Sequence, residues 1–180
     1  MDRIQVLDKS FEVYLDAPTI QERVRAMAQQ ISADYQGSRP LFLSILNGSF
    51  LFTADLLRNL SIEPEISFIK LASYKGMRST GSITTAIGLE VDLADRDVIL
   101  LEDIVDTGNT LFQFLPQLKH QHPRSIRIAT LLHKAEATVH PLVLDYVGFV
   151  IPNKFVVGYG LDYDGWGRQY DAIYQLASEQ

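Results

Sequence analysis

The stretch Val98–Leu111, VILLEDIVDTGNTL, decides the fold of this chain. It opens with four apolar residues, continues with the two carboxylates Glu102 and Asp103, and then passes through a polar loop into apolar residues at helical spacing, Leu111, Phe112 and Leu115. This order predicts strand, loop and helix. An unbroken apolar run is typical of a buried strand in a parallel α/β sheet, where ligands bind beyond the carboxyl ends of the strands. We therefore expect Glu102 and Asp103 to lie at a ligand site.

The loop that follows has the chemistry of a phosphate site. It consists of Asp106, Thr107, Gly108, Asn109 and Thr110, and it offers two hydroxyls, backbone N–H groups and the N-terminus of the next helix. Because the two carboxylates would repel a phosphate, we expect them to serve sugar hydroxyls, a divalent cation, or both. Together these groups indicate a phosphorylated ribose as ligand. The alternative is an acidic strand end followed by an ordinary capped helix.

The composition sets outer limits on the function. A length of 180 residues with 47% hydrophobic and 21% charged residues predicts one globular domain. The net charge of -6 argues against binding of nucleic acid through overall charge. The chain contains no cysteine, which excludes disulfides and thiolate chemistry. Without a signal-peptide core or an apolar run near ~20 residues, we expect a cytoplasmic protein with no membrane partner.

A second strand, loop and helix precede the first. The apolar run Leu41–Leu46 stops at Asn47, Gly48 and Ser49, and a helical pattern then begins at Phe50. We interpret the loop either as a second anion site or as an ordinary connection between a strand and a helix. Further strands are predicted at residues 11–15, 65–74, 84–91 and 126–132, and an amphipathic helix is predicted from about Pro18 towards Gly37.

Residues 98–111 as a whole resemble the phosphoribosyl-pyrophosphate (PRPP) signature of type I phosphoribosyltransferases. The resemblance covers about residues 41–168. It implies an α/β fold with a central, mostly parallel, twisted sheet flanked by helices, a small hood lobe and a mobile lid loop. It also implies a single domain over residues 1–180, with a core at about 17–145 and a hood formed by the N-terminal arm and about 146–180.

The resemblance also assigns roles around PRPP. Glu102 and Asp103 would bind the ribose hydroxyls and a Mg²⁺ ion, and Asp106 would act as general base or acid at N7 of a purine. The 5′-phosphate would lie in the loop, where Asn109 replaces the lysine or arginine often found there; the loop residues are Asp106, Thr107, Gly108, Asn109 and Thr110.

Residues 46–49 resemble the pyrophosphate-binding loop of hypoxanthine-guanine phosphoribosyltransferases. The resemblance implies pyrophosphate contacts from Asn47 and Gly48, and a cis peptide between Leu46 and Asn47. Asn47 stands where many members have lysine, so this loop would contribute dipoles rather than a charge. Ser73 and Tyr74, followed by residues 79–81, resemble the lid, which would close the site against water during transfer.

The C-terminal third, residues 147–163, resembles the hood that closes over the base. Phe155 would stack on the purine, Val156 would bind its Watson–Crick edge through backbone groups, and Lys134 would bind the exocyclic oxygen of a 6-oxopurine. Asp162 would lie by the purine and by the metal on the pyrophosphate side. Arg168 would contact pyrophosphate through its guanidinium group.

The resemblance implies a purine salvage enzyme that transfers phosphoribose from PRPP to hypoxanthine, and to guanine as well, as a homodimer or homotetramer. Two alternatives stay open: a regulatory protein that senses PRPP, and an enzyme for another base, of which xanthine is the hardest to exclude. The sequence decides neither the preferred purine nor the role of Trp166. The four histidines, His120, His122, His133 and His140, show no spacing typical of a metal site.

Overall fold

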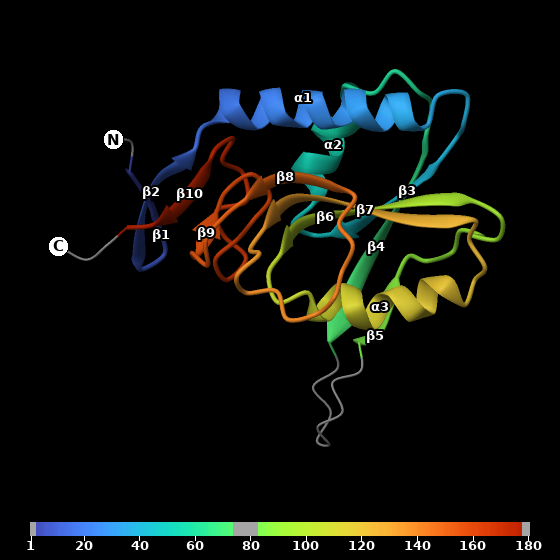
Figure 1. Cartoon of the computed structure of the whole chain (residues 1–180). Coiled ribbons are helices and arrows are strands. Elements are labelled where there is room, and N and C mark those ends of the chain that lie inside the picture. Colours follow the sequence, from blue (N-terminus) through green and yellow to red (C-terminus); the bar gives the residue numbers. More distant parts are fainter. Residues whose placement is uncertain (1–2, 74–82, 178–180) are drawn as a thin grey trace.

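Two β-sheets and three helices make up the computed structural model, which describes residues 3–73 and 83–177 (Figure 1). The larger sheet has the strand order β5-β4-β3-β6-β7-β8, in which β4, β3, β6, β7 and β8 run parallel and β5 is antiparallel to β4. Its strands are β3 (Leu41–Leu46), β4 (Glu65–Ser73), β5 (Ile83–Ile87), β6 (Asp97–Val105), β7 (Ser125–His133) and β8 (Tyr146–Val150). The predicted α/β fold with a mostly parallel sheet is confirmed.

Helices cover both faces of this sheet. Helices α1 (Ala17–Asp34) and α2 (Phe50–Arg58) lie on one face, and α3 (Asn109–Lys119) lies on the other (Figure 1). Helix α1 begins where the side chain of Asp16 accepts a hydrogen bond from the N–H of Thr19 at 2.9 Å, with Pro18 in the first turn. Its buried residues recur every three or four positions, so that one face of the helix packs on the sheet: Ile20, Val24, Met27 and Ile31.

The strands of the larger sheet are apolar on both faces because each face has its own core. Along β3, Leu41 and Leu43 belong to the core beneath α3, whereas Phe42 belongs to the core beneath α1 and α2. The same alternation occurs along β6, where Val98 and Ile99 enter different cores. Burying one such side chain contributes roughly 1.5–3 kcal/mol, so the unbroken apolar runs bind the three layers together.

The smaller sheet joins the two ends of the chain. It is antiparallel with the order β1-β2-β10-β9, and its strands are β1 (Arg3–Val6), β2 (Lys9–Leu15), β9 (Val156–Val157) and β10 (Ile173–Leu176). It lies beside the edge of the larger sheet at which β6 and β7 end (Figure 1). Strand β8, which the sequence assigned to the hood, pairs with β7 in the larger sheet instead.

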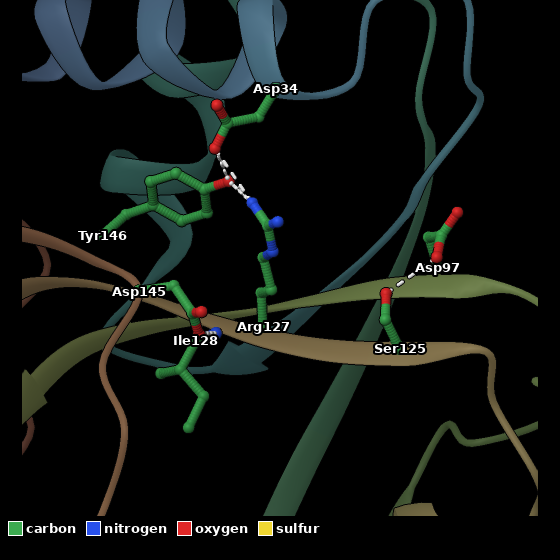
Figure 2. A network of polar contacts seen from close by, with 7 residues as sticks. All are labelled: Asp34, Asp97, Ser125, Arg127, Ile128, Asp145 and Tyr146. Carbon is green, nitrogen blue, oxygen red and sulfur yellow. Dashed lines mark hydrogen bonds and ion pairs between the residues drawn. The ribbon is translucent and has the colours of Figure 1, made fainter.

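A polar network ties α1 to the opposite, amino-terminal edge of the larger sheet. Asp34 of α1 accepts hydrogen bonds from Arg127 of β7 at 2.9 Å and from the hydroxyl of Tyr146 at 2.7 Å, and Arg127 also lies 2.6 Å from that hydroxyl (Figure 2). Nearby, Asp97 accepts a hydrogen bond from Ser125 across β6 and β7. The four residues from the sheet lie near the start of their strands, far along the sheet from the predicted ligand site.

The predicted elements agree with the structure except at some ends. Strand β5 stops at Ile87, short of the predicted end at Val91, and α3 ends at Lys119 with Pro116 inside it. No helix of the described ranges is long and apolar enough to cross a membrane.

Candidate active site

The predicted site residues gather at the carboxyl edge of the larger sheet. Strands β3, β6 and β7 are parallel, so the segments that follow them lie at one edge. Residues 47–49 follow β3, residues 106–108 follow β6, and Lys134 follows β7. The C-terminal segment reaches the same edge, because the backbone of Gly160 lies against that of Gly48 and Arg168 donates to the carbonyl of Gly160. Segments separated by more than 100 residues therefore surround one region.

Glu102 and Asp103 lie within strand β6, which continues to Val105, and not beyond its end as the sequence suggested. Strand β3 pairs with β6 only as far as Leu101, whereas β7 pairs with β6 through Val105. The two carboxylates therefore lie beyond the last pair between β3 and β6, although β3 stays paired with β4 as far as Leu46. Because successive residues of a strand point to opposite faces, they separate: Asp103 lies against Gly48, and Glu102 lines the pocket of the following loop.

Both carboxyl groups bind protons more tightly than usual. Burial, and then the charge of Asp103, raise the pKa of Glu102 well above its ordinary value. Burial also raises the pKa of Asp103 to about 6, although backbone N–H groups and the nearby guanidinium of Arg168 lower it. One oxygen of Glu102, Oε2, is buried and has no hydrogen-bond partner among the residues that the structure describes. A buried carboxylate oxygen that lacks a partner is suited to a hydroxyl donor or a cation.

The carboxylates of this region offer a cation such as Mg²⁺ oxygen donors only. Within residues 3–73 and 83–177, no three His, Asp or Glu side chains are grouped as a metal site, so Asp162 does not complete one with Glu102 and Asp103. Mg²⁺ commonly binds through one or two carboxylates together with substrate phosphates. The oxygen-only donors and the unpartnered Oε2 of Glu102 fit a cation of that kind, and they do not form a closed cage of protein ligands.

The loop after β3 packs tightly against Asp103. The peptide bond between Leu46 and Asn47 is cis, as expected. A Cβ atom on Gly48 would lie 1.6 Å from Oδ2 of Asp103, so only glycine fits between the loop and the carboxylate. From the other side, a Cβ atom on Gly160 would lie 2.0 Å from the carbonyl oxygen of Gly48. The backbone of the C-terminal segment therefore rests directly on this loop.

Buried hydroxyls anchor the same loop, which the sequence analysis did not foresee. Ser49 donates to the carbonyl of Ile45, and the hydroxyl of Ser44 lies 2.7 Å from those of both Ser49 and Thr53. All three hydroxyl-bearing residues are buried. Their signal in the sequence was three small polar residues in an otherwise apolar stretch, but only the folded chain shows that they pair with one another.

Asp106 and Lys134 form an ion pair at the ends of neighbouring strands. Nζ of Lys134 donates to Oδ2 of Asp106 at 2.9 Å, and the Lys134 side chain is 8% exposed whereas that of Asp106 is 47% exposed. The pair forms because Val105 and His133, the residues just before them, are partners in the parallel ladder. The sequence analysis gave these residues separate roles and did not predict that they touch.

The loop from Asp106 to Thr110 encloses a small pocket. Gly108 adopts a left-handed conformation with φ of 79° and forms the N-cap of α3. The pocket has a volume of about 80 Å³, and it is lined by Glu102 and by residues 104–111. That volume holds roughly two or three water molecules at ~30 Å³ each, which is a size suited to a phosphate group. N–H groups in the first turn of α3 lack acceptors within the helix and are available to an anion.

Two of the predicted purine residues, Phe155 and Val156, lie at the start of β9 in the small sheet. Phe155 is 43% exposed and packs against Phe11 and against the edge of Tyr163, with ring centres 6.1 and 5.7 Å apart. Val156 is buried in β9, which pairs with β10. Phe155 therefore has a supported ring that is still partly open to a ligand.

Asp162 and Arg168 bind each other. Nη2 of Arg168 lies 2.7 Å from Oδ1 of Asp162, and Nη1 donates to the carbonyl of Gly160 at 2.7 Å. The other oxygen of Asp162 accepts the N–H of Gly165 at 2.6 Å. Both charges lie close enough to Asp103 to alter its pKa, Arg168 lowering it and Asp162 raising it. The guanidinium is thus held beside the loop after β3.

Of the predicted lid residues, the structure describes only Ser73. Ser73 is the last residue of β4, and Tyr74 lies outside the described residues, as do residues 79–81. Trp166, whose role the sequence left open, is 65% exposed and exchanges two backbone hydrogen bonds with Tyr163.

Comparison with known proteins gives consistent matches. A profile of the phosphoribosyl transferase domain matches residues 10–164. The hypoxanthine phosphoribosyltransferase of Buchnera aphidicola subsp. Schizaphis graminum is 40% identical over 157 residues, which cover 86% of this chain and 89% of that protein. The hypoxanthine-guanine-xanthine phosphoribosyltransferase of Tritrichomonas foetus is 33% identical over 174 residues, which cover 96% and 95%.

A solved structure agrees with these relatives. The crystal structure of a hypoxanthine-guanine phosphoribosyltransferase from Bacillus anthracis superimposes with a TM-score of 0.87 at 33% sequence identity. The match covers 92% of this chain and 98% of that one. Fold and sequence therefore point to the same group of proteins.

Proposed function

This chain belongs to the phosphoribosyltransferase family, among the hypoxanthine-guanine enzymes, and we propose that it transfers the 5-phosphoribosyl group from PRPP to hypoxanthine and guanine. The products would be IMP or GMP and pyrophosphate. The observation that carries the proposal is the contact between Lys134 and Asp106, because it places a cation for the purine oxygen beside a base for the purine proton. Asp106 also lines the pocket of the phosphate loop, together with Glu102.

The reaction exchanges one bond at C1 of the ribose for another. N9 of the purine attacks C1 as the bond from C1 to the pyrophosphate oxygen breaks, and pyrophosphate leaves with the electron pair. The proton on N7 passes to Asp106, whose partly exposed carboxylate can reach the base. Lys134 donates a hydrogen bond to the exocyclic oxygen. Purine binding therefore separates Lys134 from Asp106 and gives each a partner on the base.

Glu102 and Asp103 bind the ribose and stabilise the positive charge that develops on it during transfer. They accept hydrogen bonds from the 2′- and 3′-hydroxyls, and their negative potential stabilises the positive charge that develops on the ribose. Mg²⁺, bound through these carboxylates and PRPP, would neutralise the leaving pyrophosphate. Asp162, held by Arg168 and Gly165, lies near Asp103 on the side assigned to pyrophosphate.

The remaining groups bind the two ends of PRPP and the ring of the base. The 5′-phosphate occupies the pocket of Asp106–Thr110, at the N-terminus of α3. Pyrophosphate contacts the backbone N–H groups of the loop at Asn47 and Gly48, and the guanidinium of Arg168. Phe155 stacks on the purine, and Val156 supplies backbone groups to its edge. The lid of Ser73 and Tyr74 then excludes water.

Pyrophosphate release measures the proposed function directly. PRPP and Mg²⁺ are supplied with hypoxanthine, guanine, xanthine, adenine or uracil in separate reactions. We expect turnover with hypoxanthine and guanine. Xanthine is the second candidate substrate, because the Tritrichomonas foetus relative carries xanthine in its name. A folded protein that binds PRPP and is silent with all five bases would instead indicate a PRPP sensor.

We further propose a homodimer or homotetramer in the cytoplasm, with the small sheet and residues up to 177 acting as the hood. The proposal follows the family resemblance. Light scattering coupled to gel filtration tests the oligomer, and a single peak at 20.3 kDa would contradict it.

A further inference from the structure

A segment outside the predicted site runs along the phosphate loop. It follows β7 and includes Thr138, Val139 and His140. The hydroxyl of Thr138 donates to the carbonyl of Asp106 at 2.7 Å, and the N–H of Val139 donates to the carbonyl of Thr107 at 3.1 Å. Two consecutive residues are therefore bonded to the backbone of the loop, and they fix the position of His140, the next residue.

His140 contacts the first turn of α3 in two ways. Nε2 of its ring donates to Oδ1 of Asn109, the first residue of the helix. The ring also stacks on Phe112, with centres 4.1 Å apart and an angle of 8° between the planes. Because Asn109 and Phe112 are three residues apart, they lie on one side of the helix, and the imidazole covers both. The ring is thus held by a hydrogen bond and by stacking.

The hydrogen bond determines which end of the Asn109 amide can meet a ligand. An asparagine side chain has one acceptor end and one donor end. Since the oxygen is bound by His140, the NH₂ group is the end left for other partners. An NH₂ group attracts phosphate, whereas a carbonyl oxygen at the same place would repel it. Asn109 also lines the pocket proposed for the 5′-phosphate.

We propose that His140 is a positioning residue for the 5′-phosphate, acting through Asn109. It holds the Asn109 amide with its donor end available to the phosphate before the ligand arrives. His140 does not touch the substrate itself. The inference rests on the proposed function, and it adds to that function a residue from a different segment of the chain.

Binding of IMP and of inosine, measured by calorimetry, separates the phosphate from the rest of the nucleotide. The variants are His140→Ala, His140→Gln, Asn109→Ala and the double variant H140A/N109A. His120→Ala, an exposed histidine at the far end of α3, is the matched control. We expect His140→Ala to weaken IMP binding about five- to tenfold, the effect of one lost hydrogen bond, and to leave inosine binding unchanged.

The other variants test the route through Asn109. Glutamine can donate to the Asn109 oxygen, so His140→Gln should recover part of the IMP affinity. In the Asn109→Ala background, His140→Ala should weaken IMP binding by less than about a further twofold, because the two residues act as one unit. In steady state, His140→Ala should raise KM for PRPP and leave KM for hypoxanthine unchanged.

Several outcomes would overturn the inference. Unchanged IMP binding in His140→Ala would remove the role, and equal losses for IMP and inosine would show a purely structural effect. Additive losses in the double variant would show that His140 acts independently of Asn109. If the unmodified protein bound no IMP and showed no turnover, the proposed function itself would be wrong. The unmodified protein thus tests the proposed function separately from the role of His140.

Discussion

The carboxylate of Asp106 and the ammonium group of Lys134 form an ion pair, so the chemistry of each residue depends on the other. The lysine is almost completely buried, so the carboxylate is the partner that satisfies its charge. A purine that presents an oxygen to the lysine and an N–H to the carboxylate can replace both halves of the pair. A base with the reverse pattern, such as adenine, would face the lysine with an amino group. We therefore expect the pair to favour 6-oxopurines.

Asp106→Asn removes the proton acceptor and keeps the size of the side chain. We expect kcat to fall by about 10²- to 10⁴-fold, the usual contribution of a general base, while PRPP still binds. Steady-state kinetics with hypoxanthine and calorimetry with PRPP measure the two effects. Near-normal turnover would remove Asp106 from its assigned role.

Lys134→Ala removes the donor that we propose for the exocyclic oxygen of the purine. We expect KM for hypoxanthine to rise about 10- to 100-fold, as for loss of a hydrogen bond from a charged donor, with a much smaller change for PRPP. Lys119→Ala, an exposed lysine at the end of α3, serves as the control. An unchanged response to hypoxanthine would refute the assignment.

Asp103→Asn tests the cost of burying a carboxylate. The pKa of Asp103 is about 6 in the folded protein against 3.8 ordinarily, so the folded state holds its proton more tightly. The contribution of Asp103 to the free energy of unfolding is therefore fully present below about pH 4, and it is lost as the pH rises through 6. The asparagine variant should be more stable than the unmodified protein by about 1–3 kcal/mol at pH 8 and equally stable at pH 4.

Urea unfolding at pH 4 and pH 8 measures this difference. Asp164→Asn is the control, because Asp164 is exposed and asparagine also accepts its left-handed backbone. Turnover of the Asp103 variant should fall, since the carboxylate serves the ligand. If the two proteins unfolded with the same pH dependence, the raised pKa would be wrong.

At the scale of the elements, the site exists because β3 ends before β6 does. Pairing between the two strands stops at Leu101, and the chain after β3 turns back over Asp103 instead of extending the sheet. The loop is then enclosed by Asp103 on one side and by the backbone of Gly160 on the other. Three segments meet here without room for one additional methyl group.

Gly48→Ala adds that methyl group. Its Cβ atom would lie 1.6 Å from the Asp103 carboxylate, so the loop or the carboxylate must move. We expect turnover to fall about 100-fold, as for a displacement of about 1 Å among catalytic groups. Initial rates with saturating PRPP and hypoxanthine measure the loss.

Gly37→Ala is the control for this substitution. A Cβ atom at Gly37 would meet nothing within 4 Å, although its φ of +76° makes alanine unfavourable there. This variant should lose about 1 kcal/mol of stability and keep full activity. Equal activity of the two variants would show that the space at Gly48 is not required.

At the scale of the whole molecule, the two edges of the larger sheet have different tasks. Unsatisfied and strongly perturbed acids lie towards the carboxyl edge, where Glu102 has an oxygen without a partner. The amino edge carries the hydrogen-bonded network of Asp34, Arg127 and Tyr146 (Figure 2). Function is thus concentrated at one edge, and the other edge contributes stability.

Arg127→Met tests this division. The change removes the hydrogen bonds to Asp34 and Tyr146 and keeps much of the side-chain volume. We expect the free energy of unfolding to fall by about 1–3 kcal/mol, with kcat and KM unchanged. Arg124→Met breaks the ion pair of a more exposed arginine with Asp97 and should cost less than about 1 kcal/mol. A loss of activity in Arg127→Met without unfolding would contradict the division.

The sequence alone predicted the order of the elements from the strand at residues 11–15 to the strand at residues 126–132, and the kind of chemistry. Apolar runs such as Val98–Leu101 predicted buried parallel strands because each needs a core on both faces, and Asp106–Thr110 predicted a phosphate loop because its groups are contiguous. These are local patterns, which one strand or loop displays by itself. The match of motifs to a known family then assigned residues as distant as Lys134 and Phe155 to one site.

Only the tertiary structure decided which groups touch. The pairing of Lys134 with Asp106, the enclosure of Gly48 by Asp103 and Gly160, and the contact of His140 with Asn109 all join segments far apart in the sequence. Such contacts depend on strand register and on the point at which each strand leaves the sheet. The pairing of β8 with β7, in a segment that the sequence placed in the hood, is likewise a property of the sheet, and no pattern within the strand itself encodes it.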